Sequence, residues 1–195
     1  MPQPRTMKIL ERRMLQQGFS EDIITQLNFP EAKTGDKVIE LVNKMNKLLT
    51  KEQCLDIMGE HGCFKTGMMD KKSKAIGKEL KDKSLVEKLE LMKTNDYGWK
   101  PYMNDDGELV YITCINMKSD DEDGMFKAPK QCACPPIRET KIPILVSNIY
   151  CCCCAGHAKH HIQNILGIKL RLKSVGIIPN EDNELYSRIF TYEII

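Results

Sequence analysis

Residues 144–175 read ILVSNIYCCCCAGHAKHHIQNILGIKLRLKSV, and this stretch decides the fold. The apolar run at 144–150 predicts a strand that leads directly into four adjacent cysteines, Cys151–Cys154. Residues 156–166 predict a helix, which the glycine that follows would end. Alternating residues over 168–175 predict a further strand. The C-terminal part is therefore expected to combine a sheet with one helix placed after the cysteine run.

The character of the sequence changes near residue 95. Residues 1–95 predict helices, for example over 36–49, where apolar side chains recur on one face at helical spacing. Residues 96–195 add a hairpin over 99–115 and a last strand over 186–195. We therefore expect an α+β fold, in which an N-terminal helical layer packs on a C-terminal antiparallel sheet as one compact unit.

Composition limits the class of protein. The chain has 195 residues, of which 42% are hydrophobic, so it can bury a core without disulfide bonds. A formal net charge of +2 gives no strong field for nucleic acid, and we expect no such partner. No uncharged apolar run approaches the roughly 18 residues of a membrane span, and charges interrupt the N-terminus where a signal peptide would lie. These features predict a cytoplasmic protein without a membrane partner.

The nine cysteines are the most unusual feature, and their odd number excludes full pairing into disulfides. Disulfides are rare in the reducing cytosol, where cysteines serve as metal ligands, redox groups or core residues. Cys114, between Ile112 and Ile115 on a predicted strand, is expected to be a core residue. The other eight fall into three groups: Cys54 with Cys63, Cys132 with Cys134, and Cys151–Cys154.

Two Cys-x-Cys pairs predict a metal centre. In an extended chain residues i and i+2 face the same side, so Cys132 pairs with Cys134, and Cys151 with Cys153. Facing each other, the two pairs would form a four-thiolate site for zinc, although an iron–sulfur cluster takes the same ligands. Burial as small apolar side chains is the plainer alternative for all of these cysteines. Two further candidate ligands come from the first group, Cys54 and Cys63.

His157 opens the predicted helix and could complete a mixed Cys/His site, and His160 and His161 share its face. The positive end of the helix dipole would favour the thiolate forms of Cys153 and Cys154. This supports a second hypothesis, a thiol- or metal-dependent hydrolase or reductase with one of these cysteines as nucleophile and His157 as base. Whether the protein is an enzyme stays open.

The segment from Tyr150 to Ser174 resembles a motif of some uncharacterised bacterial and archaeal proteins: an aromatic residue, Cys-x-Cys-Ser-x-Gly, a short helix and a strand ending in Glu-Ser. Those proteins resemble the small-molecule-binding domain of the bacteriochlorophyll 4-vinyl reductase type. Cys151 and Cys153 match the motif cysteines, and Cys154 stands where the family has serine. The remaining matches are Gly156, Ser174, the Cys54/Cys63 pair around Met58-Gly59, and Cys132-x-Cys134-Pro135.

The resemblance covers about residues 50–195 and implies an α+β fold with a metal or ligand site, but no established reaction. The last strand departs from the family pattern, which carries Cys-x-Phe there. Residues 180–190 hold no cysteine, and Arg188 stands two residues before Phe190. If the family cysteine serves a metal, this chain must lack or replace that ligand.

We therefore expect a cytoplasmic domain that binds zinc and that binds or senses a small-molecule ligand, with a homodimer as a further expectation. An iron–sulfur protein, or a thiol- or metal-dependent hydrolase or reductase, is the alternative.

Overall fold

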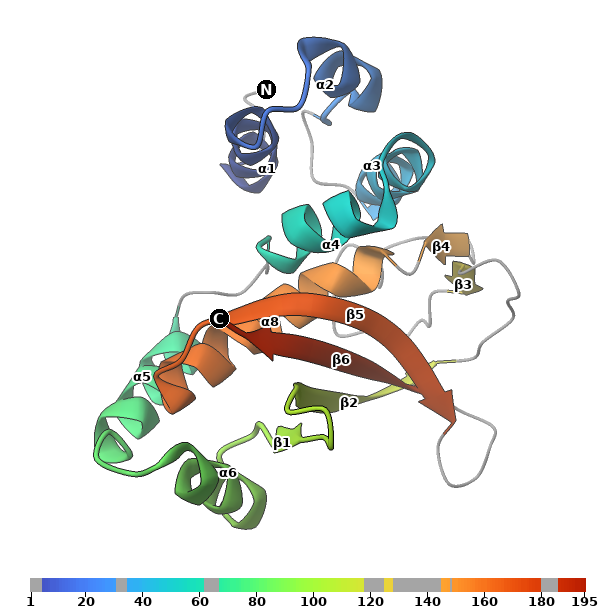
Figure 1. Ribbon diagram of the computed structural model, residues 1–195. Helices are drawn as coiled ribbons and strands as arrows, with labels where there is room; N and C mark the ends of the chain where they lie inside the picture. The colour runs from blue at the N-terminus through green and yellow to red at the C-terminus, as the bar shows by residue number, and fades with distance from the viewer. Residues whose placement is uncertain are drawn as a thin grey trace.

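A long helix, α8 (Ile149–Leu166), lies against one face of an antiparallel sheet (Figure 1). The structure is a computed structural model, and it describes residues 5–30, 35–61, 67–117, 125–127, 145–147, 149–179 and 186–195. The strand order in the sheet is β1-β2-β6-β5. Its strands are β1 (Tyr102–Met103), β2 (Leu109–Met117), β5 (Leu170–Pro179) and β6 (Tyr186–Ile194).

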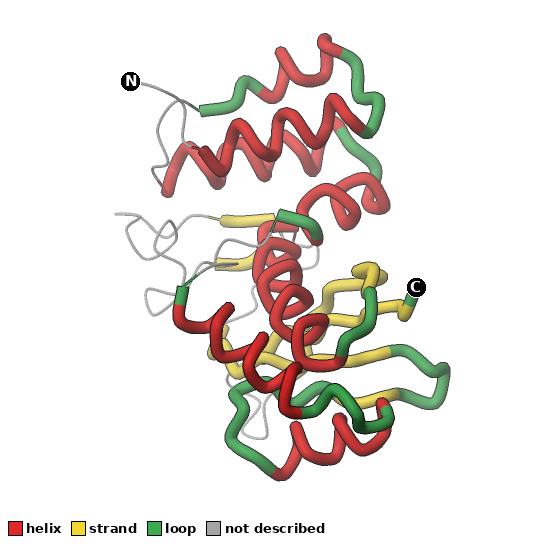
Figure 2. The backbone as a smooth tube through the Cα atoms, turned by 90° about the vertical axis from the view of Figure 1, so that its left-hand side faces the viewer, coloured by secondary structure: helices red, strands yellow, loops and turns green. Residues whose placement is uncertain are grey.

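The helices that precede the sheet cover the other sides of α8. Helices α4, α5 and α6 all contact α8, and α4 also contacts β5. Helices α1, α2 and α3 gather at the end of the molecule opposite the sheet (Figures 1 and 2). The helices are α1 (Arg5–Gln16), α2 (Glu21–Leu27), α3 (Gly35–Leu48), α4 (Lys51–Gly59), α5 (Met68–Glu79) and α6 (Leu85–Thr94). This arrangement confirms the predicted α+β fold with N-terminal helices and a C-terminal antiparallel sheet.

Local sequence signals explain where several helices begin. Thr50 and Gln53 form the capping box that the sequence predicts at the start of α4, and Ser84 and Glu87 form a second one at the start of α6. Ser20 caps α2 by accepting a hydrogen bond from the backbone of Ile23. None of the helices in the described ranges is long and apolar enough to cross a membrane.

The sheet presents a buried face to α8. On β6, three alternate residues, Arg188, Phe190 and Tyr192, are 0% exposed, as the period of two in a strand requires. The hydroxyl of Tyr192 donates a hydrogen bond to the backbone oxygen of Ala155 on α8, at 2.8 Å. A continuous apolar core extends from α1 through α3, α4 and α8 to these strands.

The cysteine run is helical, and the predicted strand before it is shorter than expected. Strand β4 (Leu145–Ser147) pairs with β3 (Met125–Lys127), and α8 already begins at Ile149. The hydroxyl oxygen of Ser147 accepts a hydrogen bond from the backbone N–H of Ile149, which satisfies one donor of the first turn. Cys151–Cys154 therefore occupy the first two turns of α8. Because positions three or four apart share a helix face, the predicted pairing of Cys151 with Cys153 on one side is wrong, and Cys151 lies one turn before Cys154.

Candidate functional site

Thiols gather where α4 contacts the first half of α8: Cys151, Cys54 and Cys154 all lie near Cys152. Cys54 and Cys151–Cys154 are present as thiols. Cys114 belongs to β2 as predicted, but its side chain is outside the described part of the structure. Three predicted ligands also lie outside the described residues, namely Cys63, Cys132 and Cys134.

Burial separates the four cysteines of α8 into a deep and a shallow pair. Cys151 and Cys152 are 0% and 1% exposed, whereas Cys153 is 8% exposed and Cys154 is half-buried. The helix begins at Ile149, and the helix dipole stabilises negative charge mainly in the first turn. The thiolate stabilisation predicted for Cys153 and Cys154 therefore applies to Cys151 and Cys152 instead. Among the four, Cys154 is therefore the one that a reagent can approach first.

The deep thiols belong to the contact between α4 and α8. Cys54 is 0% exposed, and its Sγ lies 3.8 Å from the backbone oxygen of Met45. Burial, with a contribution from Glu52, raises the pKa of Cys54 to about 11. Burial also raises the pKa of Cys152 far above its ordinary value, and the nearby thiols of Cys151 and Cys54 raise it further. Both groups are thus protonated apolar side chains at neutral pH.

A buried cation lies beside the shallow cysteine Cys154. Arg188 on β6 is 0% exposed, and its Nη1 donates a hydrogen bond to Sγ of Cys154 at 3.4 Å. A guanidinium stays charged under all ordinary conditions, so it favours negative charge on this sulfur.

His157 lies on the partly exposed face of α8, one turn after Cys153. Positions i and i+4 of a helix bring side chains to neighbouring places on its surface, so Cys153 and His157 can reach one point. The ring of His157 packs edge-on against that of His161, with 4.7 Å between ring centroids. His157 lies within α8, in its third turn, rather than at the start of the helix as predicted, and its closeness to the cysteines stays a prediction.

The other two histidines of α8 join it to α5. The ring of His160 lies 2.8 Å, Nε2 to Oδ1, from the carboxylate of Asp70. The hydroxyl of Ser73 donates to the backbone oxygen of Asp70, which uses its only hydrogen. The same hydroxyl oxygen lies 3.0 Å from Nδ1 of His161 and accepts a hydrogen bond from the side-chain amide of Asn164, so Ser73 links α5 to two residues of α8.

Trp99 completes this network. It is the only tryptophan in the chain, and it stacks on His161 with 4.8 Å between ring centroids. Both residues are buried. Sequence reasoning missed Asp70, Ser73 and Trp99, because no motif connects them to α8. Trp99 offers a fluorescent reporter for the histidine cluster.

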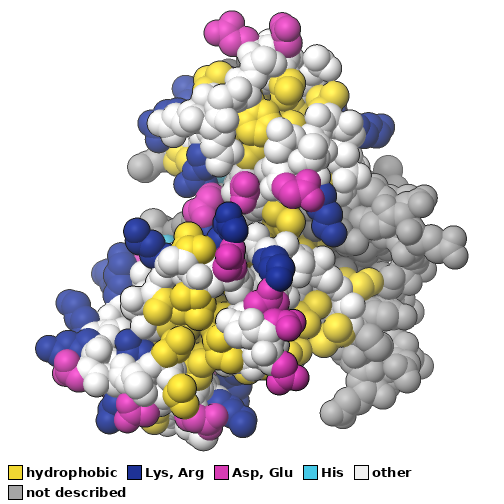
Figure 3. Space-filling view, viewed as in Figure 1, with side chains coloured by type: hydrophobic (Ala, Val, Ile, Leu, Met, Phe, Trp, Pro, Cys, Tyr) yellow, Lys and Arg dark blue, Asp and Glu magenta, His cyan; other side chains and the backbone are white. Residues whose placement is uncertain are grey.

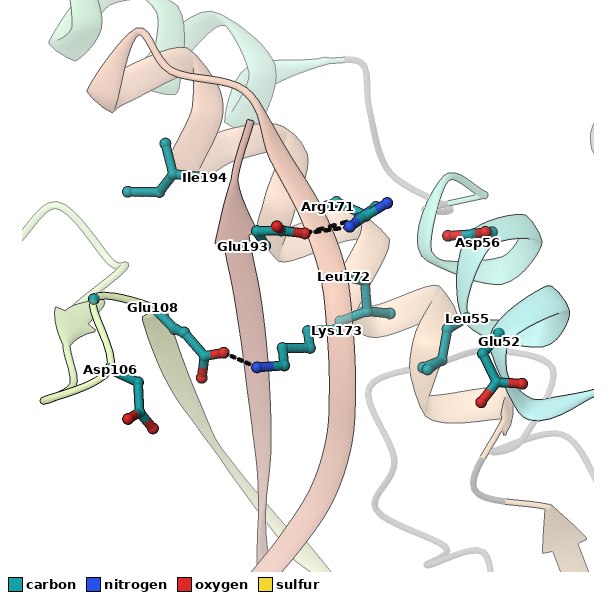
Figure 4. A pocket seen from close by; sticks show the side chains of 11 residues that line it. Glu52, Leu55, Asp56, Asp106, Glu108, Arg171, Leu172, Lys173, Glu193 and Ile194 are labelled. Atoms are coloured by element: carbon teal, nitrogen blue, oxygen red, sulfur yellow. Dashed lines mark hydrogen bonds and ion pairs between the residues drawn. The ribbon is translucent and has the colours of Figure 1, made fainter.

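A groove on another face carries a different set of side chains. It has a volume of about 560 Å³ and runs between α4, the β1–β2 turn and strands β5 and β6. Figure 3 shows acidic and basic side chains interleaved across the middle of this face. Arg171 pairs with Glu193 and Lys173 pairs with Glu108 (Figure 4). Exposed pairs of this kind stabilise little, and no cysteine or histidine lines the groove.

No three His, Cys, Asp or Glu side chains among the described residues are arranged to hold a metal ion. The described part of α8 therefore supplies at most two ligands, and the predicted site stays a prediction. Comparison of the chain with protein-family models, with curated proteins and with solved structures found no match. The resemblance to the 4-vinyl reductase type is a prediction as well.

Proposed function

We propose that this protein binds one zinc ion through Cys153 and His157 of α8, together with Cys132 and Cys134. The last two lie outside the described residues, and they come from the Cys-x-Cys segment that the sequence singles out. Three thiolates and one imidazole form a closed tetrahedral set, which is typical of structural rather than catalytic zinc.

The observation that carries this proposal is the position of Cys153 and His157 one turn apart on α8, where His157 is half-buried and Cys153 is 8% exposed. Their spacing, four residues, is one that zinc proteins use to place two ligands on one helix face. The thiol and the ring are the soft and borderline ligands that zinc prefers. Cys54 and Cys152, by contrast, influence each other directly and belong to the contact between α4 and α8.

Burial is the reason why the proposed zinc site leaves out two of the predicted ligands, Cys54 and Cys151. Cys54 and Cys151 are both 0% exposed, and the core that surrounds Cys54 keeps its thiol protonated. We propose that they stabilise the fold by packing, while metal binding uses the shallow face. A zinc ion there would tie α8 to the chain around residue 132 and so couple metal binding to folding.

The biological role that we propose is the one expected from the sequence, a domain that binds or senses a small molecule. We propose that it is a cytoplasmic ligand-binding or sensing domain that zinc stabilises. The implied resemblance to a small-molecule-binding domain supports this role, and no described residue set points to a particular reaction.

Variants of the full chain test the proposal. The unmutated protein, purified without oxygen, should contain about one zinc per chain by elemental analysis. Cys153→Ala and His157→Ala should each lose most of that zinc. Cys152→Ala is the matched control, because this neighbour is buried, and it should keep the metal. Zinc retained in both ligand variants would refute the ligand assignment, and a metal-free unmutated protein would refute the proposal.

A further inference from the structure

The helical cysteine run contains one pair of thiols with a geometry suited to disulfide formation. Cys151 and Cys154 are three positions apart in α8, and an ideal helix separates such Cα atoms by about 5 Å. Disulfide-bonded cysteines have Cα atoms about 4.4–6.8 Å apart, so the Cα spacing of this pair allows the bond. Their Cβ atoms, about 5–6 Å apart in a regular helix, must approach to about 4 Å, which requires a local adjustment of the first turns of α8. Within the run no other two cysteines have this spacing.

The two thiols differ in access. Cys154 is half-buried, whereas Cys151 is 0% exposed and lies one turn deeper in the same helix. A dissolved oxidant therefore meets Cys154 first and leaves Cys151 as the second, internal thiol. This division into an attacking and a resolving cysteine is the one that C-x-x-C redox pairs need.

The surroundings of Cys154 favour the attacking role. The guanidinium of Arg188 donates a hydrogen bond to Sγ at 3.4 Å from a side chain that is itself 0% exposed. It therefore stabilises negative charge on the sulfur that attacks. Tyr192, two residues later on β6, holds the same turn of α8 through the backbone oxygen of Ala155, so the cation and the thiol keep their relative positions.

We propose that Cys151 and Cys154 form a redox-active dithiol that exchanges with low-molecular-weight disulfides. The thiolate of Cys154 attacks one sulfur of the external disulfide, its S–S bond breaks, and one external thiolate leaves. The sulfur of Cys151, after losing its proton to solvent, attacks Sγ of Cys154 and displaces the second external thiolate. The protein dithiol is oxidised by two electrons, the external disulfide is reduced to two thiols, and the protons of the protein thiols pass to them through water.

This activity does not rest on the zinc site, because the proposed zinc ligands are other residues. The two proposals also fail separately. The metal content of a sample decides the first, and the pairing of thiols in the same sample decides the second.

The experiment treats the folded full chain with excess glutathione disulfide, alkylates the remaining thiols and maps them by mass spectrometry. We expect the loss of two alkylatable thiols per chain, both from the peptide that holds α8. The variant Cys152→Ala, which keeps the proposed pair and every proposed zinc ligand, should still lose two.

Single variants then assign the roles. Cys151→Ala should stop at one glutathione per chain, bound to Cys154, because the resolving thiol is missing. Cys154→Ala should lose most of the reactivity of this peptide. Trp99 emission verifies that each variant is folded. A Cys152→Ala protein without the disulfide, a Cys151→Ala protein that still loses two thiols from α8, or an unmutated protein that does not react would each overturn the proposal.

Discussion

Replacing Gly77 with alanine tests the contact between α5 and α8 that positions the histidine network. A Cβ atom at this position would lie 2.0 Å from the backbone oxygen of Asn164 on α8, whereas ordinary van der Waals contact begins at about 3.4 Å. The obstacle is backbone rather than a flexible side chain, so one helix must shift. In an unconstrained helix the same change would stabilise by about 1 kcal/mol.

Overpacking a core contact typically costs about 1–3 kcal/mol, and this clash is severe enough to outweigh the gain in helix propensity. We expect Gly77→Ala to reduce the free energy of unfolding by about 2 kcal/mol. For a chain of this size that lowers Tm by about 4–8 °C. Thermal melts followed by circular dichroism measure the change.

A control in the same helix separates propensity from packing. Ala75 is exposed two residues earlier, so Ala75→Gly should destabilise by about 1 kcal/mol through propensity alone. If Gly77→Ala is as stable as the unmutated protein or more stable, α5 and α8 do not approach this closely, and the placement of Ser73 beside His161 loses its basis.

Three further predictions concern charges and thiols around the site. Hydrogen bonds from Lys74 and then His160 lower the pKa of Asp70 from 3.8 to about 2. The stabilisation that this carboxylate contributes is therefore present above about pH 4 and is lost as the pH falls toward 2. Asp70→Asn should flatten that part of an acid-unfolding curve, and an unchanged slope would contradict the assignment. Glu60→Ala should lower the free energy of unfolding, measured by urea melts, by about 1–3 kcal/mol, because it removes an ion-pair partner of Lys159, whose side chain is 3% exposed. A decrease smaller than a few tenths of a kcal/mol would mean that the ammonium group finds an equivalent partner. Since the pKa of Cys54 is about 11, this thiol should react with an alkylating reagent at pH 7 far more slowly than Cys154, and equal rates in the folded protein would refute its burial.

The sequence predicts most of the architecture because local signals mark it. The capping box at Thr50 and the turn that joins Tyr102 to Leu109 fix a helix start and a hairpin within a few residues. The boundary of α8 was missed for an equally local reason. Four identical side chains carry neither the period of a strand nor that of a helix, so Cys151–Cys154 give no information on their own conformation.

The candidate site was less predictable because its contacts join distant parts of the chain. Ser73 and His161 are 88 positions apart, and Arg188 and Cys154 are 34 apart. No spacing rule relates such residues, and only the packing of α5 and β6 on α8 brings them together. That His157 and the cysteines form a site stays a prediction, and the fold adds that burial divides the four cysteines of α8 into a deep and a shallow pair.

The ligand shell of bound zinc tests the central claim most directly. X-ray absorption at the zinc edge of anaerobically purified protein should show three sulfur atoms at about 2.3 Å and one nitrogen atom at about 2.0 Å. That shell corresponds to Cys132, Cys134, Cys153 and His157. A shell of oxygen and nitrogen alone, or a sample that contains no zinc, would contradict the account.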